Sequence, residues 1–338
     1  MPDDTYTGPI NPDPQPGEAD VELYGYVPSA VLGVVGVLVF LIVLSINTFR
    51  WFKNRKTGTL SFYFFLAFGA LLEAAGYGCR IASHNNPYKT DIFIVEFFLV
   101  TCAPIAFAAS IYLNLTFATK KYPLGRRLLW LNPRWVLIIF IAFDLCTSKS
   151  GSESSIPAVI QIAGAGIVGI STSKSLSGES VSVSPQTGNS ILEAGLAVQI
   201  TSFGCFLILL TIAITRIPRL GGIPPVVDLE VKKWATTNCR KLLGITMFSA
   251  LLILLRTSYR LACQVQGYFG YLNTHEYLFG LLDFTPVAIA TLTLSFFPPS
   301  KYLFPPPELP EWQVNLEMAP KPEGTATPPT PPSYQESV

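Results

Sequence analysis

Apolar residues along this chain gather in long runs that recur too often for the core of a soluble domain. A helix that crosses a bilayer needs about 20 mostly apolar residues. The sequence offers seven such runs, so we predict an all-α, polytopic membrane protein with seven transmembrane helices. The expected spans are 28–49, 59–80, 91–118, 135–170, 192–215, 242–263 and 277–297.

The fourth run is interrupted. Its first part, WVLIIFIAFDLCTS, is too short to cross a bilayer alone, and the polar piece KSGSESS separates it from IPAVIQIAGAGIVGI. We expect either a broken helix here or an insertion at the outer surface, centred on residues 149–157.

Two polar segments flank the spans. Residues 1–27 contain six acidic residues and no basic one, unlike the positively charged start of a cleaved signal peptide. The first apolar run is therefore expected to be retained as a span. Residues 298–338 are rich in proline and should form an extended or disordered tail after the 28–297 membrane domain.

The positions of Lys and Arg predict the orientation. Of the 23 basic residues, 17 fall in the connections after spans one, three and five and in the tail. Cytoplasmic loops carry such an excess of Lys and Arg. The N-terminus is thus expected outside the membrane and the C-terminus in the cytoplasm.

Composition narrows the function classes. Half of the residues are hydrophobic and 13% are charged, against about a quarter in soluble domains. A net charge of +1 argues against a strongly basic nucleic-acid binder. The two histidines and six scattered cysteines, expected as buried free thiols, favour no metal site.

No cofactor or enzymatic activity is expected either. The chain has no GxxxxGK[ST] phosphate loop, and the GAGIVG element at 164–169 lies among membrane spans without the amphipathic helix of a dinucleotide site. No serine–histidine or histidine–carboxylate arrangement occurs within the spans.

Ionisable residues within the spans share one depth. In the predicted orientation they all fall in the outer half of the bilayer, although a charge at the bilayer centre costs about 2.5–3.5 kcal/mol. Six carboxylates with three arginines predict a shared polar cavity that favours a cationic or zwitterionic head group. Alternatively, some of these residues only lock helices together or extend to water near span ends. The set is Glu73, Arg80, Glu96, Asp144, Glu193, Arg256, Arg260, Glu276 and Asp283.

Several short elements occur in a recognisable order: YGYVPS at 24–29, Gly76-Tyr77, Ala103-Pro104, Gly195-Leu196 with Gln199, and Tyr259-Arg260. With the charged positions above, they resemble the fungal lipid-translocating exporters, a seven-span family that includes the yeast sphingoid long-chain base exporter and the aminocholesterol-resistance protein. The resemblance spans roughly residues 24–300. The candidate substrate-binding residues are Glu73, Tyr77, Arg80, Glu96, Asp144, Gln199, Arg256, Arg260, Glu276 and Asp283.

This resemblance implies transport of amphipathic lipids toward the outer leaflet, at the plasma membrane. Sphingoid long-chain bases, sterol-like amines and toxic amphiphiles are the expected substrate classes. The alternative is a seven-span receptor or lipid sensor that signals to a cytosolic partner, because it would have the same topology. A lipid-flux measurement would separate the two.

The tail carries a candidate protein-binding motif. Pro331, Pro332 and Tyr334 belong to a PPxY sequence. Extended proline segments dock into the aromatic grooves of WW domains. A WW-domain ubiquitin ligase is therefore a possible cytosolic partner.

Overall fold

The structure is a computed structural model, and it describes residues 23–55, 58–121, 185–217, 229–266 and 270–303, with positions 11, 13, 15, 18 and 19 before them. The regular secondary structure of the described part is helical, apart from one isolated β-bridge between Glu18 and Lys89. Six of its helical segments are long and apolar enough to cross a membrane. The first five are α1 (Ala30–Lys53), α2 (Leu60–Asn85), α3 (Thr90–Lys121), α6 (Pro185–Arg216) and α7 (Leu229–Gln266).

The sixth span is built from several pieces. After the short α8 (Tyr271–Thr274), it runs through α9 (Glu276–Leu278), a π-helical turn η3 (Phe279–Phe284), α10 (Thr285–Phe296) and α11 (Pro299–Leu303). The prediction of an all-α protein with multiple apolar helices is confirmed for six of the seven runs. The fourth predicted span, 135–170, lies outside the described residues.

The largest difference from prediction is the start of α7, at Leu229 instead of residue 242. Its first turns, LEVKKWATTNCRK, are polar and therefore escape a hydropathy criterion, but they contain no helix breaker. At 1.5 Å per residue, the 38-residue helix is about 57 Å long, well beyond a hydrocarbon core of about 30 Å. The polar turns of α7 therefore extend past the membrane.

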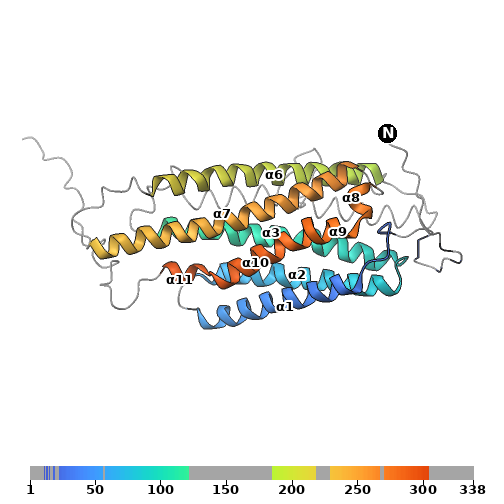
Figure 1. Ribbon diagram of the computed structural model, residues 1–338, viewed down its shortest axis with the longest axis horizontal. Helices are drawn as coiled ribbons and strands as arrows, with labels where there is room; N and C mark the ends of the chain where they lie inside the picture. Colours follow the sequence, from blue (N-terminus) through green and yellow to red (C-terminus); the bar gives the residue numbers. More distant parts are fainter. Residues whose placement is uncertain are drawn as a thin grey trace, which may run out of the picture.

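Five spans close into a ring. Contacts run from α1 to α2, α2 to α3, α3 to α7, α7 to α10, and from α10 back to α1, while α6 packs on α7 (Figure 1). A ring of this kind encloses a shared interior to which each of its helices can contribute side chains.

Small residues let the ring helices approach closely. The buried stripe of α1 includes Gly33 and Gly36, three residues apart and hence on one face. A Cβ at Gly36 would lie 2.5 Å from the ring of Tyr77 on α2. Close contact through small residues is typical of helix pairs in membranes.

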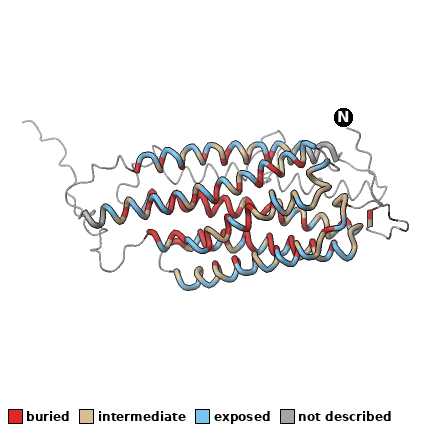
Figure 2. Tube along the Cα trace, viewed as in Figure 1, coloured by how far each residue is buried: buried red, intermediate tan, exposed pale blue. Residues whose placement is uncertain are grey.

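The distribution of polarity is that of a membrane protein. Large apolar side chains such as Val31, Leu38 and Phe64 are exposed on the outside, where lipid can cover them. Charged side chains such as Arg80 and Arg256 are buried (Figure 2 shows the burial along the trace). In water this arrangement would expose apolar surface without compensation.

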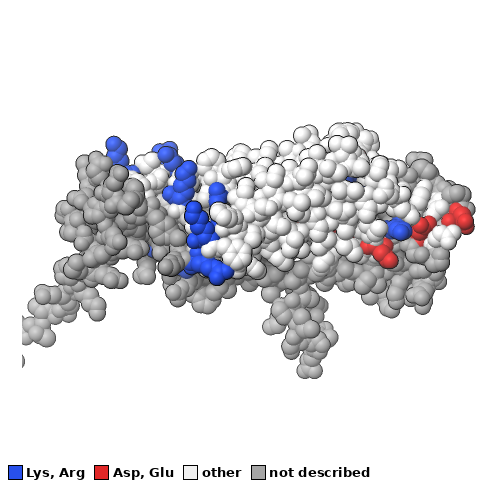
Figure 3. Space-filling view, turned by 90° about the horizontal axis from the view of Figure 1, so that it is seen from below, with Lys and Arg blue, Asp and Glu red and all other residues white. Residues whose placement is uncertain are grey.

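Surface charge is divided between the two ends of the bundle. Figure 3 shows Lys and Arg gathered at one end and acidic side chains at the other. The exposed basic residues include Lys53 of α1, Lys120 of α3, and Lys233 and Lys241 of α7. We refer to these as the basic end and the acidic end.

Candidate functional site

The helix ring encloses a buried ionic network toward its acidic end. Charged side chains come from α2, α3 and α7 and from the α9 and η3 pieces of the last span, and the described part of the network contains four carboxylates and three guanidinium groups. Its members are Glu73 and Arg80 on α2, Glu96 on α3, Arg256 and Arg260 on α7, Glu276 on α9 and Asp283 on η3.

Asp283 is the centre of the inner part. Its Oδ1 accepts from Arg256 Nε at 3.2 Å and from Arg260 Nε at 2.5 Å. Its Oδ2 accepts from Arg260 Nη2 at 3.0 Å, so Arg260 binds the carboxylate with two parallel hydrogen bonds. Such bidentate pairs are strong and fix the relative orientation of both groups. Asp283 thereby ties the last span to α7.

The local backbone presents Asp283 on a widened turn. Residues Phe279–Phe284 form a π-helical turn, and Pro286, which has no N–H to donate, lies two residues after its end. The Thr285 hydroxyl donates to the Gly280 carbonyl at 2.7 Å. Single π-helical turns within helices are frequent at functional sites. Pro286 thus lies next to an irregular turn, whereas α3 continues as a helix through Pro104.

Glu73 also belongs to the inner part, but it is held differently. Its Oε1 lies 3.1 Å from Arg256 Nη2, within ion-pair distance. The same Nη2 donates to the Val100 carbonyl at 3.0 Å. Among the described residues, no hydrogen-bond donor is aligned with either carboxylate oxygen of Glu73. Glu73 is nevertheless 1% exposed.

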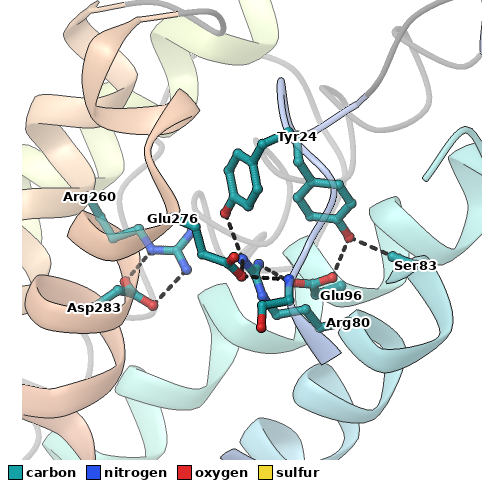
Figure 4. A network of polar contacts seen from close by, with 9 residues as sticks. Tyr24, Arg80, Ser83, Glu96, Arg260, Glu276 and Asp283 are labelled. Atoms are coloured by element: carbon teal, nitrogen blue, oxygen red, sulfur yellow. Dashed lines mark hydrogen bonds and ion pairs between the residues drawn. The ribbon is translucent and has the colours of Figure 1, made fainter. Parts of the chain in front are cut away.

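Arg80 organises the outer part of the network (Figure 4). Its Nη1 lies 3.2 Å from Glu96 Oε1, and its Nη2 lies 3.0 Å from Glu276 Oε1. The guanidinium also sits over the ring of Phe279, 4.2 Å from its centroid. The backbone N–H of Ser29, just before α1, donates to Glu276 at 2.8 Å. Arg80 therefore joins α2, α3, the last span and the start of α1.

Two tyrosines from the segment before α1 complete this outer part. The Tyr24 hydroxyl contacts Glu96 Oε2 through a short hydrogen bond and Ser83 Oγ at 3.0 Å, while the Tyr26 hydroxyl accepts from Arg80 Nη2 at 2.6 Å. Gly25 between them has a φ of +69°, a conformation that favours glycine. Burial and the Glu96 carboxylate raise the pKa of Tyr24 far above its usual range, so this phenol stays protonated and donates.

A cavity of about 100 Å³ lies beside Glu96 and Arg80. Aromatic side chains form much of its wall, namely Tyr24, Tyr26, Phe93, Phe97 and Phe279. Ligand pockets for drug-sized molecules measure roughly 300–1,000 Å³. This cavity therefore has room for a polar head group, while an acyl chain would have to remain outside it.

A smaller groove between α3, α6 and α7 adjoins this cavity. The two share Phe97, Val100, Arg260 and Gln264. Gln199, a candidate from the sequence, is buried on α6 and lines the groove together with Arg256. It thus lies next to the network without belonging to its ion pairs.

Residues 66–306 match the family described as RTA1 like protein. The chain belongs to the RTA1-like family. No solved structure matches it.

Curated relatives of this RTA1-like chain come from Saccharomyces cerevisiae. The sphingoid long-chain base transporter RSB1 is 28% identical over 305 residues, which cover 81% of this chain and 72% of the relative. Protoporphyrin uptake protein 1 is 29% identical over 248 residues, covering 72% of this chain and 71% of the relative. Protein RTM1 is 27% identical over 251 residues, with 72% and 71% covered. The resemblance found in the sequence is confirmed at the level of the family.

Not all candidate residues of the RTA1-like chain enter the network. Tyr77 is buried on α2 between Glu73 and Arg80 but forms none of the described ion pairs, and it packs between Phe40, at 5.7 Å between ring centroids, and Phe284, at 5.4 Å. Glu193 is partly exposed on α6 and forms none of these ion pairs. Asp144 lies outside the described residues. The described network therefore holds four carboxylates where the sequence predicted six.

Tyr24, Tyr26 and Phe279 were not among the predicted site residues. The first two belong to YGYVPS, which supported the family resemblance without suggesting a contact with Arg80. Two aromatic residues flanking a glycine just before a span would have been the available signal.

The cysteines follow the prediction only partly. The five described cysteines are free, and Cys102, Cys239 and Cys263 are buried as expected. Cys205, however, is exposed, because it lies on the outward face of α6. Within the described ranges, no group of three His, Cys, Asp or Glu could hold a metal ion.

Proposed function

We propose that this RTA1-like protein translocates amphipathic lipids that carry a cationic head group, with sphingoid long-chain bases as the first class to test. The observation that carries the proposal is the small aromatic-walled cavity beside Glu96, in a network with more carboxylates than guanidinium groups. The name of the relative, sphingoid long-chain base transporter, supports the same lipid class.

Two sets of contacts would recognise the head group. Its ammonium would face Glu96, where the Tyr24 hydroxyl now donates, and aromatic rings would contact the cation at their faces. A neighbouring hydroxyl of the lipid could replace the Tyr26 hydroxyl at Arg80. The acyl chain would stay in the bilayer, since the cavity of about 100 Å³ cannot contain it. We propose no enzymatic step.

Lipid flux tests this function directly. In proteoliposomes that contain the purified protein, a fluorescent sphingoid base should cross the bilayer faster than in protein-free vesicles. Glu96→Gln should slow this flux strongly, because it removes the carboxylate that faces the cavity. Glu193→Gln, an acidic residue outside the network, is the matched control and should keep the wild-type rate.

Two results would count against this proposal. If wild type, Glu96→Gln and protein-free vesicles show equal flux, the protein does not transport this lipid class. Binding of the lipid without flux would instead favour the alternative of a receptor or lipid sensor.

We further propose that the acidic end faces outward and the basic end faces the cytoplasm of the plasma membrane. The exposed Lys and Arg side chains at one end support this orientation through the positive-inside rule. With the fourth predicted span, 135–170, the chain would cross the membrane seven times. The C-terminal tail would then lie in the cytoplasm. The first residues assigned to the tail form α11, Pro299–Leu303, whereas residues 304–338 with the PPxY motif lie outside the described residues.

Truncation of the tail tests its proposed role. Removal of residues 331–338 should lengthen the residence of the protein at the cell surface, because Pro331, Pro332 and Tyr334 would no longer recruit a WW-domain ubiquitin ligase. Pulse labelling of an N-terminal tag on intact cells measures both surface lifetime and topology. An unchanged lifetime contradicts the ligase, and a tag that is labelled only after permeabilisation contradicts the orientation.

A further inference from the structure

Glu73 stands apart from the other three carboxylates of the network. Asp283 accepts three guanidinium hydrogen bonds. Glu96 accepts from Tyr24 and Arg80, and Glu276 accepts from Arg80 and the Ser29 backbone. Neither oxygen of Glu73 has an aligned donor in the described part of the chain, despite the Arg256 ion-pair distance of 3.1 Å.

Glu73 also lies deep in the bundle and is 1% exposed. It is residue 14 of the 26 in α2, two helical turns and about 10 Å from Arg80 toward the basic end. An ionised carboxylate that is buried with one ion-pair partner and no aligned hydrogen bond remains costly, and a bound proton relieves part of that cost. Carboxylates in this position are characteristic of proton relays in membrane transporters.

The charge balance leaves room for one cation. Four carboxylates and three guanidinium groups give the described network a formal charge of −1 when every group is ionised. A proton on Glu73 makes the network neutral. An ammonium group in the cavity beside Glu96 does the same. Both together leave one uncompensated positive charge in a desolvated site.

We infer that the protein exchanges one proton on Glu73 for one cationic lipid head group in the cavity beside Glu96. This inference rests on the proposed function and adds its driving force. When the ammonium arrives, Glu73 releases its proton, and when the lipid leaves, Glu73 takes up a proton from the opposite side. One positive charge moves in each direction, so the exchange is electrically neutral.

The two sites are near enough to compete. Unit charges about 10 Å apart, at an effective dielectric constant of about 20, disfavour joint occupancy by roughly 15–20-fold. That factor couples the two ligands without direct contact between lipid and Glu73.

Among the described groups that face Glu73, no other carboxylate lacks hydrogen-bond donors. From α7 they are Arg256 and Arg260, and from η3 the charged group is Asp283, which both arginines hold. On α2 itself Tyr77 lies one turn away, and α3 packs here through Val100. The buried stripe of α1, which is Gly33, Gly36, Phe40, Val43 and Asn47, has no ionisable side chain.

The test compares two driving forces in proteoliposomes that contain the full chain. For wild type, a pH gradient with excess protons on the receiving side should accelerate sphingoid-base flux, and each pH unit can support about a tenfold lipid gradient at one proton per lipid. A membrane potential of either sign, set with potassium and valinomycin at equal pH, should leave the flux unchanged. A trapped pH indicator should report proton movement only when lipid is added.

Substitution at Glu73 separates coupling from transport. Glu73→Gln should abolish the response to the pH gradient and the lipid-dependent proton signal, while an amide still permits some downhill flux. Glu193→Gln should keep both responses. If Glu73→Gln cannot be purified as a folded protein, Glu73→Asp serves instead, and it should shift the pH at which flux is half-maximal.

Three outcomes decide the inference. Wild-type flux that ignores the pH gradient, or a gradient response that persists in Glu73→Gln, overturns it and leaves the proposed transport standing. An unshifted pH profile in Glu73→Asp has the same meaning. Absence of wild-type flux under every condition overturns the proposed function itself.

Discussion

Asp283→Asn is expected to destabilise the folded protein by about 3–5 kcal/mol, the usual result of removing one partner from a buried ion pair. Asp283 is 1% exposed and holds both Arg256 and Arg260, so the substitution leaves two guanidinium groups without their shared anion. The contact between α7 and the last span would weaken most. The measurement is thermal unfolding in detergent, monitored as the loss of the monodisperse peak on size-exclusion chromatography.

Two further variants sharpen this prediction. Glu276→Gln should cost much less, about 1 kcal/mol or below, because the Glu276 side chain is 25% exposed and its partner Arg80 keeps the ion pair with Glu96. Combining Asp283→Asn with Arg260→Gln should recover part of the loss, since one of the unpaired cations is removed as well. Equal melting of Asp283→Asn and wild type would show that the inner ion pairs contribute little to the fold.

The apolar runs and the clustering of charges could be predicted because both follow from the cost of placing polar groups in lipid. The predicted span 28–49, for example, corresponds to α1, Ala30–Lys53. Likewise, charges at one depth on several spans can lower their cost only by meeting, as Arg80 and Glu96 do. Ring closure between α1 and α10 and the pairing of Arg80 with two carboxylates depend on helix rotation, which the sequence does not specify.

Features that depend on local backbone geometry were not predictable in the same way. The π-helical turn at Phe279–Phe284 changes the register of the last span by one residue. The nearby Pro286 is the one sequence feature that indicates an irregular helix there. The Tyr24 and Tyr26 contacts require the segment before α1 to fold back over the acidic end, although hydropathy places that segment outside the membrane domain. The polar start of α7 escaped a criterion built on hydropathy alone.

Substitution by alanine should have different effects on the stability of the protein at two glycines of α2. A Cβ at Gly69 would lie 2.5 Å from Cε1 and 2.7 Å from Cδ1 of Phe107 on α3. Phe107 is fully buried and cannot move aside without disturbing its neighbours. Overpacking of this kind costs about 1–3 kcal/mol. At Gly78, in contrast, no heavy atom of the described residues outside the local backbone of α2 lies within 4 Å of an added Cβ.

Gly69→Ala is therefore expected to lower the melting temperature in detergent, and Gly78→Ala to leave it unchanged or raise it. Alanine gains up to about 1 kcal/mol of helix propensity at either position, which only partly offsets the clash at Gly69. Phe107→Leu, which shortens the opposing side chain, should reduce the penalty when combined with Gly69→Ala. The same melting shift at both glycines would contradict a close approach of α2 and α3 at Gly69. Because α2 carries Glu73 and Arg80 and α3 carries Glu96, a wider spacing at Gly69 should also reduce lipid flux, whereas Gly78→Ala should preserve it.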